Sequence, residues 1–335
     1  MEHEICIQCG EAYHVAEEAV CPSCAEADTV ECSYCGERIW RENDFGDSDT
    51  ALCEACYTNH YTRCNQCGRL ISFSAAYYQD EDEDEETPYC SACYHECGEA
   101  IHCYSYKPVP IFHGNAPMYM GVELEVDDGG KDPVKAKKIL SIFNQPGEFG
   151  YIKSDGSLDD GLELVTHPCT LEAHMREVPW REALEKFKAL GYYSHQSSTC
   201  GLHVHVNRTF FGAAQAEQDE KIGHVLYLFE RFWQELLRFS RRTQRQVAQW
   251  AARYGYKDTG REIMEHAKKA YQGRYTCVNL TNTDTIEFRI FRGTLKYNTL
   301  IATLQLVEKL CNVAVSLSEE RLQALSWSDI MLGID

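Results

Sequence analysis

The chain has 335 residues, of which 44% are hydrophobic and 25% are charged, and its formal net charge is −20 at pH 7. This length suits two or three domains with buried cores. No apolar run approaches the length of a membrane helix, and the N-terminus lacks the basic and apolar segments of a signal peptide. We therefore expect a soluble, cytoplasmic protein with no membrane partner.

The negative charge is concentrated toward the N-terminus. Residues 1–110 hold 23 Asp and Glu against 5 Lys and Arg, whereas the remainder holds 29 against 27. A protein that binds nucleic-acid phosphates without regard to sequence needs positive charge instead. Nucleic acid is therefore not an expected partner of the N-terminal region.

The cysteines of the same region predict zinc modules. Fourteen of the 18 cysteines precede residue 104. Twelve of them form pairs separated by two residues: Cys6 and Cys9, Cys21 and Cys24, Cys32 and Cys35, Cys53 and Cys56, Cys64 and Cys67, Cys90 and Cys93. Two thiolates at this spacing reach one tetrahedral zinc ion from a tight turn. Gly10, Gly36 and Gly68 each follow a pair and supply the positive φ that such a turn favours. Residues 1–103 thus predict three structural zinc ions in small finger-like modules.

The sequence leaves two pairings of these cysteines open. Sequential pairing encloses loops of 11, 17 and 22 residues, and these lengths favour it over a cross-braced arrangement that joins alternate pairs. Because the modules have few large aliphatic residues, zinc must supply much of their folding free energy. The run Asp80–Glu86 in the third loop is either a solvated loop or a docking surface for a basic protein partner.

The rest of the chain predicts a separate α+β domain. Pro108 and Pro110 indicate an extended linker over residues 104–118, followed by a domain over residues 119–335. The pattern predicts strands at 121–126, 151–152, 162–165, 202–207, 275–280 and 285–292, with a turn at 153–157, and helices at 133–143, 170–190, 222–237, 259–271 and 300–317. Long helices between strands, without a repeated β-α-β period, predict a mostly antiparallel sheet with helices packed against it. The basic residues after the 222–237 stripe predict a solvated helix end or, alternatively, a phosphate contact: Arg238, Arg241, Arg242 and Arg245.

Three of the predicted strands carry ionisable residues two positions apart. These are Glu123 with Glu125, His203 with His205, and Glu287 with Arg289. Side chains at such positions share one face of a sheet. Carboxylates clustered on one face are costly unless cations neutralise them. Divalent metal ions and a polyanionic substrate would meet that need, so the pattern predicts an enzyme.

The order of these motifs resembles the amidoligase family, within the glutamine synthetase-like superfamily of carboxylate–amine ligases. The resemblance covers residues 104–317 and is carried by Tyr106–Pro110, Gly121–Glu125, Lys153–Leu158, Gly161–Pro168, Cys200–Val206 and Glu287–Gly293. It implies a curved, glutamine synthetase-like sheet. It also implies ATP-dependent amide bond formation through an acyl phosphate, with an amino acid, peptide or protein as substrate.

The resemblance also implies roles for individual residues. Five would bind Mg²⁺ or Mn²⁺: Glu123, Glu125, Glu163, His203 and Glu287. His205 and Asn207 would contact the nucleotide, while Arg289 and Arg292 would hold phosphate or a substrate carboxylate. The Asp-Gly-Ser element of glutamine synthetase lies in a preceding domain rather than after the Glu-x-Glu strand, so the resemblance transfers no role to Asp155, which we assign to positioning the amine or the substrate. Asp159 and Asp160, close to Glu163, also suit an exposed turn.

Two other functions fit part of the pattern. In a metallohydrolase, His203, His205 and the glutamates would hold zinc around a water molecule. That reading leaves Arg289, beside Glu287, without a role. In a non-catalytic adaptor, the zinc modules would act alone. That alternative would not explain why the Glu-x-Glu, His-x-His and Glu-x-Arg motifs are all intact. Cys200, next to the histidine strand, predicts a buried thiol more readily than a nucleophile.

Overall fold

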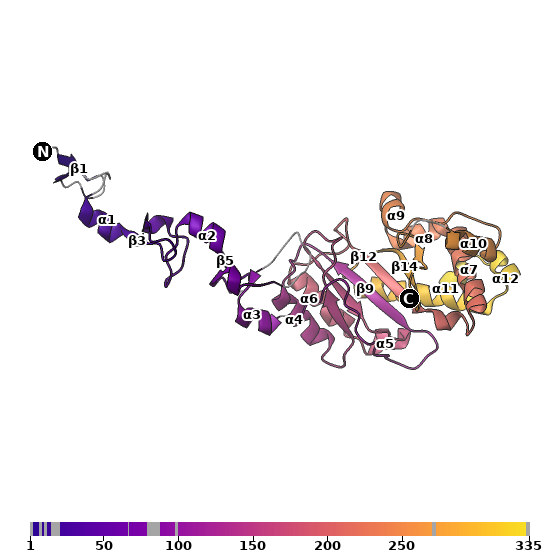
Figure 1. Cartoon of the computed structure of the whole chain (residues 1–335). Helices are drawn as coiled ribbons and strands as arrows, with labels where there is room; N and C mark the ends of the chain where they lie inside the picture. The colour runs from indigo at the N-terminus through magenta and orange to yellow at the C-terminus, as the bar shows by residue number, and fades with distance from the viewer. Residues whose placement is uncertain are drawn as a thin grey trace. The chain divides into compact units, whose positions relative to one another are not determined.

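The computed structural model describes residues 3–6, 9, 12–14, 21–65, 67–78, 88–97, 100–269 and 273–332. The chain forms two compact units, Met1–Gly98 and Glu99–Asp335, which Figure 1 colours from indigo to yellow along the chain. Gly10 and the acidic run Asp80–Glu86, both singled out above, lie outside the described residues.

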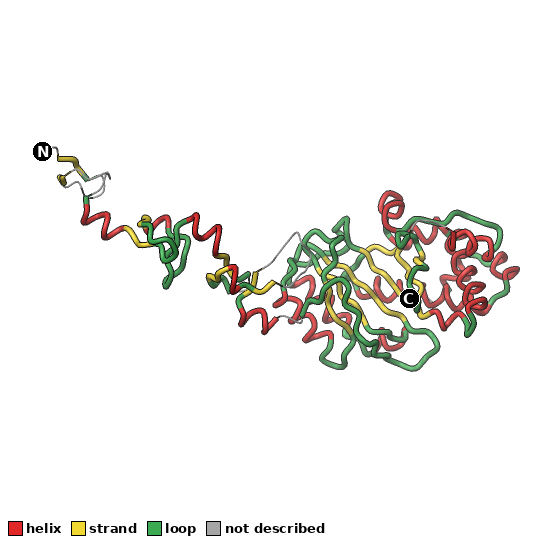
Figure 2. The backbone as a smooth tube through the Cα atoms, in the orientation of Figure 1, coloured by secondary structure: helices red, strands yellow, loops and turns green. Residues whose placement is uncertain are grey.

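The first unit repeats one local plan, in which a short antiparallel hairpin precedes a seven-residue helix (Figure 2). The helices are α1 (Pro22–Asp28), α2 (Glu54–His60) and α3 (Ser91–Cys97). The strands are β1 (His3–Ile5), β2 (Ala12–His14), β3 (Thr29–Glu31), β4 (Arg38–Trp40), β5 (Tyr61–Arg63), β6 (Leu70–Ser72), β7 (Tyr77–Tyr78) and β8 (Pro88–Tyr89). Because β3 begins directly after α1, and β5 directly after α2, the repeats follow one another without a linker.

A six-stranded antiparallel sheet forms the centre of the second unit, in the order β10-β11-β9-β12-β14-β13. The strands are β9 (Met120–Val126), β10 (Gly150–Lys153), β11 (Leu162–Thr166), β12 (Gly201–Asn207), β13 (Val278–Asn279) and β14 (Thr285–Arg292). The predicted mixture of helices with an antiparallel sheet is therefore confirmed, and each of the predicted strands is present in the sheet.

Alternation of side chains gives this sheet two different faces. Val122, Leu124, Val204 and Phe288 on one face are fully buried in a core shared with the helices. The helices of the unit are α4 (Pro133–Phe143), α5 (Leu171–Arg176), α6 (Trp180–Ala189), α7 (Gln215–Arg231), α8 (Trp233–Ser240), α9 (Gln244–Trp250), α10 (Gly260–Lys269), α11 (Tyr297–Ser316), α12 (Glu319–Ala324) and α13 (Trp327–Met331). The opposite face carries the ionisable residues.

Two helical predictions need correction. The helix predicted over 170–190 is divided into α5 and α6, because Pro179 lacks the N–H that a continuous helix requires and its ring obstructs the preceding turn. The stripe over 222–237 is likewise divided, with Phe232 between α7 and α8. α4 has the predicted bounds.

One described helix, α11, is long and apolar enough to cross a membrane by length and composition alone, contrary to the expectation that no segment would be. Within its most apolar window, 56% of the residues are buried inside the unit. Its buried side chains, including Leu304, Leu306 and Leu310, belong to the core. These contacts are those of a core helix.

The segment predicted as a linker, 104–118, belongs to the second unit. The His113 N–H donates to the Pro168 carbonyl over 2.9 Å, and the Thr170 N–H donates to the His113 carbonyl over 3.0 Å. Just before this segment, His102 forms a parallel bridge with Lys153. The segment therefore lies along the sheet instead of standing free.

Candidate active site on the polar sheet face

Strand register brings the predicted ionisable residues together. Glu123 pairs with His203, Glu125 with Glu163, and His205 with Glu287. All six side chains lie on the face opposite the core, since they alternate with the buried apolar residues. Glu123 and His205 are half-buried, and the other four are buried.

His203 lies at the centre of this cluster. Its Nδ1 atom is 3.2 Å from Glu123 Oε2, 3.7 Å from Glu287 Oε1 and 3.9 Å from Glu125 Oε1. Two groups have ligand atoms within 4.8 Å of one another: Glu123, His203 and Glu287, and Glu125, Glu163 and His203. Carboxylate oxygens with one imidazole suit a hard divalent cation such as Mg²⁺ or Mn²⁺. Either group could hold such an ion, with His203 available to both.

The pKa values divide the carboxylates into two kinds. Burial raises the pKa of Glu163 well above its usual value, and the negative charge of Glu123 adds to the rise. Burial also raises the pKa of Glu125. At Glu123 burial acts in the same direction, but His205 and His203 outweigh it and hold its pKa well below the usual value. One half of the cluster therefore favours protonation in the absence of a cation.

Lys153 is a site residue that sequence reasoning missed. It pairs with Glu163 in the β10–β11 register, and its Nζ lies 3.2 Å from Glu163 Oε2. The ammonium is buried with its partner, so it compensates part of the Glu163 charge. The sequence feature that could have identified Lys153 is its spacing of two residues from Tyr151, which places both side chains on the polar face of an edge strand.

A β-bulge in β14 settles the direction of Arg292. In the pairing of β12 with β14, His205 lies opposite Glu287 and Gly201 lies opposite Arg292. The register shifts between Leu202 and Val204, so two residues of β14 lie opposite the single residue His203. Strict alternation from Glu287 would place Arg292 on the core face, whereas the extra residue returns it to the polar face. Arg289, also on this face, donates from Nη1 to Glu287 Oε1.

Arg242 is a further site residue. We expected its side chain to be solvated at a helix end, but it is buried. It follows α8 and is only 8% exposed. A Cβ on Gly201 would lie 2.5 Å from Arg242 Nη2 and 2.6 Å from His203 Nε2, so only glycine leaves room for the guanidinium over β12. Burial lowers the pKa of Arg242 to about 10; the Glu125 charge opposes this fall, and the positive charges of Arg289 and Arg292 add to it.

Asp127 fixes the loops beside the cluster. Its fully buried carboxylate accepts hydrogen bonds from Thr199 Oγ1 over 2.5 Å, the Asp160 N–H over 2.7 Å and the Asp159 N–H over 3.1 Å. Asp159 and Asp160 thus contribute their backbone N–H groups, rather than their carboxylates, to this turn. Glu163, which follows them, is 2% exposed, so the exposed-turn interpretation is not correct for its side chain.

Three remaining predicted residues have distinct surroundings. Asp155 lines the same cavity as the glutamates, and its Oδ1 accepts from both the N–H and the hydroxyl of Ser157 over 2.6 Å. Asn207 accepts from the Tyr119 N–H and donates to the Pro117 carbonyl and to Thr209, and its assignment to the nucleotide stays a prediction. Burial raises the pKa of Cys200 to about 12, which disfavours a nucleophilic thiolate.

The cluster lines a cavity of about 60 Å³. Its acidic part comprises Glu123, Glu125, Asp155 and Glu163, and its cationic part comprises Lys153, Arg242, Arg274 and Arg289. Aromatic rings complete the lining: Tyr104, Trp250 and Tyr275. Arg274 donates to the Tyr104 hydroxyl, so residues far apart in the sequence meet here.

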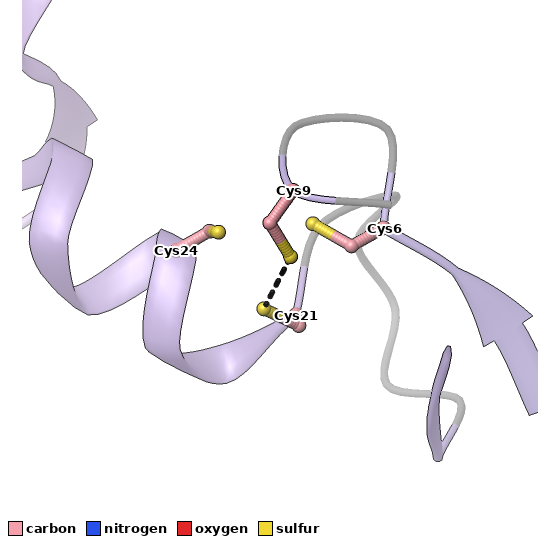
Figure 3. Close-up of side chains that lie close together, drawn as sticks. All are labelled: Cys6, Cys9, Cys21 and Cys24. Atoms are coloured by element: carbon pink, nitrogen blue, oxygen red, sulfur yellow. Dashed lines mark hydrogen bonds between the residues drawn. The ribbon is translucent and has the colours of Figure 1, made fainter. Parts of the chain in front are cut away.

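In the first unit, the cysteines gather in three sequential groups, as the loop lengths favoured: Cys6, Cys9, Cys21 and Cys24; Cys32, Cys35, Cys53 and Cys56; Cys64, Cys67, Cys90 and Cys93. Figure 3 shows the first group, with Cys9 Sγ 3.7 Å from Cys21 Sγ. The equivalent distances in the other groups are 3.9 and 3.8 Å. Thiolates at about 2.3 Å from a tetrahedral zinc ion lie about 3.8 Å apart. Gly36 and Gly68 have φ of +78° and +71°, as predicted.

The second unit is thus a mixed helix and sheet domain with a buried carboxylate–histidine cluster suited to divalent cations. The model of a family described as "Putative amidoligase enzyme" matches residues 135–311, more than half of the chain. The chain belongs to this family, whose description indicates a ligase that forms amide bonds. No curated protein matches the chain. The matched range includes Glu163, His203 and Glu287 but begins after Glu123 and Glu125.

Proposed function

We propose that the second unit is an ATP-dependent carboxylate–amine ligase of glutamine synthetase-like fold. In the proposed reaction, the γ-phosphoryl group of ATP passes to a substrate carboxylate, and an amine then displaces phosphate from the acyl phosphate to form an amide. The observation that carries the proposal is the pair of cation-binding groups around His203, which adjoins buried guanidinium groups on the same sheet face. Phosphoryl transfer requires both kinds of charge.

The carboxylate groups would hold Mg²⁺ or Mn²⁺, with Glu123 and Glu287 in one site and Glu125 and Glu163 in the other. When bound, such ions bridge phosphate oxygens and neutralise their charge. His205 is assigned to a nucleotide phosphate. Burial opposes its protonation, but the nearby Glu123 charge prevails and raises the pKa of His205, which favours the cationic form that binds phosphate.

The remaining polar groups suit the two substrates. Arg289, whose position beside Glu287 is fixed by a hydrogen bond, is placed to stabilise a phosphoryl group or a carboxylate. Asp155 offers a carboxylate that attracts the ammonium form of an amine. The present cavity is smaller than the roughly 300–1,000 Å³ of ligand sites. We therefore expect Tyr104, Arg274 and Tyr275 to move when nucleotide binds.

The zinc modules are proposed to bind a basic peptide or protein that is substrate or partner. Two of them repeat an aromatic pair at equivalent positions: Phe45 packs on Tyr57 with centroids 5.9 Å apart, and Tyr77 packs on Tyr94 at 5.0 Å. Phe45 and Tyr77 are each 40% exposed. Exposed aromatic rings on an acidic surface suit a cationic partner.

The test is ADP release by the full chain with Mg²⁺, ATP and panels of amino acids, polyamines and peptides, followed by mass measurement of the adduct. Glu123→Gln combined with Glu125→Gln should abolish turnover while the protein stays folded. Glu185→Gln, on an exposed face of α6, is the control and should retain activity. Failure of the full chain to bind Mg-ATP saturably would overturn the ligase proposal and favour the adaptor. Cleavage without ATP would favour the metallohydrolase.

A further inference from the structure

We propose that a second pocket of the second unit binds a small zwitterion, which strengthens metal binding at Glu287. The ligand class is a free amino acid, or a dipeptide, with an apolar side chain. The pocket lies between α7, α10 and residues 280–283. The regulatory part of this inference rests on the metal sites of the proposed ligase, whereas the binding of the zwitterion does not.

The second pocket is much larger than the cavity of the carboxylate cluster. Its volume is about 490 Å³, compared with about 60 Å³ for that cavity, and pockets for small molecules measure roughly 300–1,000 Å³. Among the described residues, the two share no lining residue. Met264, Ala267 and Leu280 form an apolar wall that packs in or against the core on the helix-covered side of the sheet. A ligand in this pocket would therefore not lie on the polar sheet face.

The packing of α7 against α10 fixes the two helical walls of the pocket (Figure 1). A Cβ on Gly223 would lie 2.6 Å from the Gly260 carbonyl oxygen, so the backbones of the two helices touch where these glycines meet. Asp219 and Met264, each about one turn from that contact, line the pocket. Lys268, about one turn further along α10, donates to Asp219 Oδ2. These contacts hold the walls in place before a ligand binds.

Asp219 is the acidic group of the pocket. Its Oδ1 accepts from Gln215 Nε2 over 2.9 Å, and its Oδ2 accepts from Lys268 Nζ. Burial opposes the ionisation of Asp219, but these hydrogen bonds prevail and lower its pKa. They use two of the roughly four acceptor positions of a carboxylate, so others can accept from the ammonium group of a ligand.

Arg208 and Lys268 are the cationic groups of the pocket. Arg208 donates from Nε to the Asn282 carbonyl over 3.0 Å and from Nη2 to the Leu280 carbonyl over 2.7 Å. These bonds use two of the five N–H groups of a guanidinium, and the others suit a ligand carboxylate. A simple acid would meet the Asp219 charge, and a simple amine would meet two cations. A zwitterion with an apolar side chain suits both signs of charge and the apolar wall.

The segment that borders the pocket also supports the proposed metal ligand Glu287. Thr281, which lines the pocket, donates from its N–H and its hydroxyl to Asn279 Oδ1, over 3.0 and 2.9 Å. The Nδ2 atoms of Asn279 and Asn282 in turn donate to Glu287 Oε2, over 2.8 and 3.4 Å. Because Arg208 holds two carbonyls of this segment, a ligand bound to Arg208 would stabilise the segment and the orientation of Glu287. Such coupling is reciprocal, so the metal should also strengthen binding of the zwitterion.

The first experiment measures binding to the full chain by calorimetry, without ATP. The probes are L-leucine and L-leucyl-L-leucine, and the comparators are isopentylamine, which lacks the carboxylate, and 4-methylpentanoate, which lacks the ammonium group. At least one zwitterion should bind about tenfold more tightly than either comparator.

Two variants assign the two charges of the zwitterion. Asp219→Asn should weaken its binding about tenfold without weakening that of 4-methylpentanoate, because only the ammonium contact is lost. Lys268→Gln should weaken the zwitterion and 4-methylpentanoate but not isopentylamine. Arg261→Gln, on an exposed face of α10, is the matched control and should bind as the unmodified chain does. Should Asp219→Asn fail to fold, Lys268→Gln, whose side chain is half exposed, provides the comparison.

The second experiment titrates Mn²⁺, followed by electron paramagnetic resonance, with and without a saturating zwitterion. The zwitterion should raise Mn²⁺ affinity about fivefold or more. Unchanged Mn²⁺ affinity would overturn the regulatory role. Absence of Mn²⁺ binding in the unmodified chain would overturn the metal sites of the ligase proposal, and the regulatory role with them.

Three results would overturn the binding site itself. The first is that no zwitterion binds more tightly than its comparators. The second is that Asp219→Asn weakens all probes equally, which would indicate structural damage rather than a lost contact. The third is that a non-hydrolysable ATP analogue displaces the zwitterion, since the pocket would then belong to the nucleotide. Saturable binding of Mg-ATP, which tests the ligase proposal, is measured separately and does not depend on these results.

Discussion

Asn279 donates from Nδ2 to Glu287 Oε2 over 2.8 Å, from the edge strand β13 to the neighbouring β14. Asn279 is 2% exposed, so this hydrogen bond is shielded from water. It fixes Oε2 of Glu287, while Oε1 lies 3.7 Å from His203 Nδ1 and accepts from Arg289 Nη1. An outer residue thereby orients a proposed metal ligand.

Replacing Asn279 by Ala should weaken Mn²⁺ binding. Partners that orient metal ligands typically contribute about 10–100-fold in affinity, and we expect a loss in this range. Titration of Mn²⁺ followed by electron paramagnetic resonance measures it. Asn282→Ala removes only a 3.4 Å contact to the same oxygen and should have a smaller effect. Equal affinity in Asn279→Ala and the unmodified chain would show that Glu287 needs no such support.

Gly201→Ala should disturb the cluster more than the fold. The new methyl group would collide with Arg242 Nη2 and His203 Nε2 and would come within 3.1 Å of Glu125 Oε2. We expect Mn²⁺ affinity to fall about tenfold or more, because these groups must move from the arrangement that binds the ion. Gly121→Ala on β9 is the matched control, since its Cβ would meet nothing closer than 3.7 Å. Similar losses in both variants would contradict this explanation.

Metal binding should release protons. Because burial raises the pKa of Glu163 and Glu125, the metal-free protein favours their protonated forms. The stability that these protonated groups contribute is lost as the pH rises through their raised pKa values. A cation binds the deprotonated carboxylates, so Mn²⁺ affinity should increase with pH over that range. Calorimetry in two buffers of different ionisation enthalpy counts the protons. A count of zero at pH 6 would show that both groups are already ionised.

Asp127→Asn should destabilise the second unit. The new amide would direct its N–H₂ group at donors that now bind the carboxylate, at a cost of about 1–3 kcal/mol in the free energy of unfolding at pH 7. Although burial opposes it, hydrogen bonding from the Thr199 hydroxyl and from three backbone N–H groups lowers the pKa of Asp127. The stability that the Asp127 carboxylate contributes is therefore present at pH values above its pKa in the unfolded chain. It is lost as the pH falls through its pKa in the folded protein.

Urea unfolding at pH 7 and pH 4 tests both statements. The difference between Asp127→Asn and the unmodified chain should shrink on acidification. The neighbouring Asp128 is exposed and has φ of 65°, a conformation that Asn tolerates, so Asp128→Asn should leave stability nearly unchanged. A constant difference at both pH values would mean that the Asp127 charge is not responsible.

Chelation of zinc should unfold the first unit selectively. We expect three zinc ions per chain, and loss of far-UV circular dichroism from residues 1–98 when they are removed, because few apolar residues hold these modules together. Cys53→Ser should lower the zinc content to two. Cys103→Ser, exposed and outside all three groups, should leave it at three. Elemental analysis provides the count, and an unchanged content in Cys53→Ser would exclude the proposed ligand set.

The sequence predicted those parts of the site that depend on strand periodicity. Glu123, Glu125, His203, His205 and Glu287 were expected on one face, because alternation in an antiparallel sheet fixes their direction. Sequential grouping of the cysteines followed from loop lengths. Both predictions rest on local spacing along the chain, and the structure agrees with them.

The cationic part of the site could not be predicted in the same way. Arg292 returns to the polar face only through the bulge, and nothing in the alternation indicates an extra residue. Arg242 reaches the cluster from the end of a distant helix across Gly201, a contact set by packing rather than by periodicity. Lys153 and Asp127 were missed because their partners, Glu163 and Thr199, are remote in sequence or on another strand.

The extra residue in β14 also offers a simple route by which the charge of the polar face could change during evolution. Deleting one of the two residues opposite His203 would restore regular pairing and leave Glu287 in place. The same deletion would turn the side chain at position 292 toward the core, where selection would favour an apolar residue. A single codon lost or gained at this point could thus remove a guanidinium group from the polar face, or add one to it, while Glu287 keeps its position.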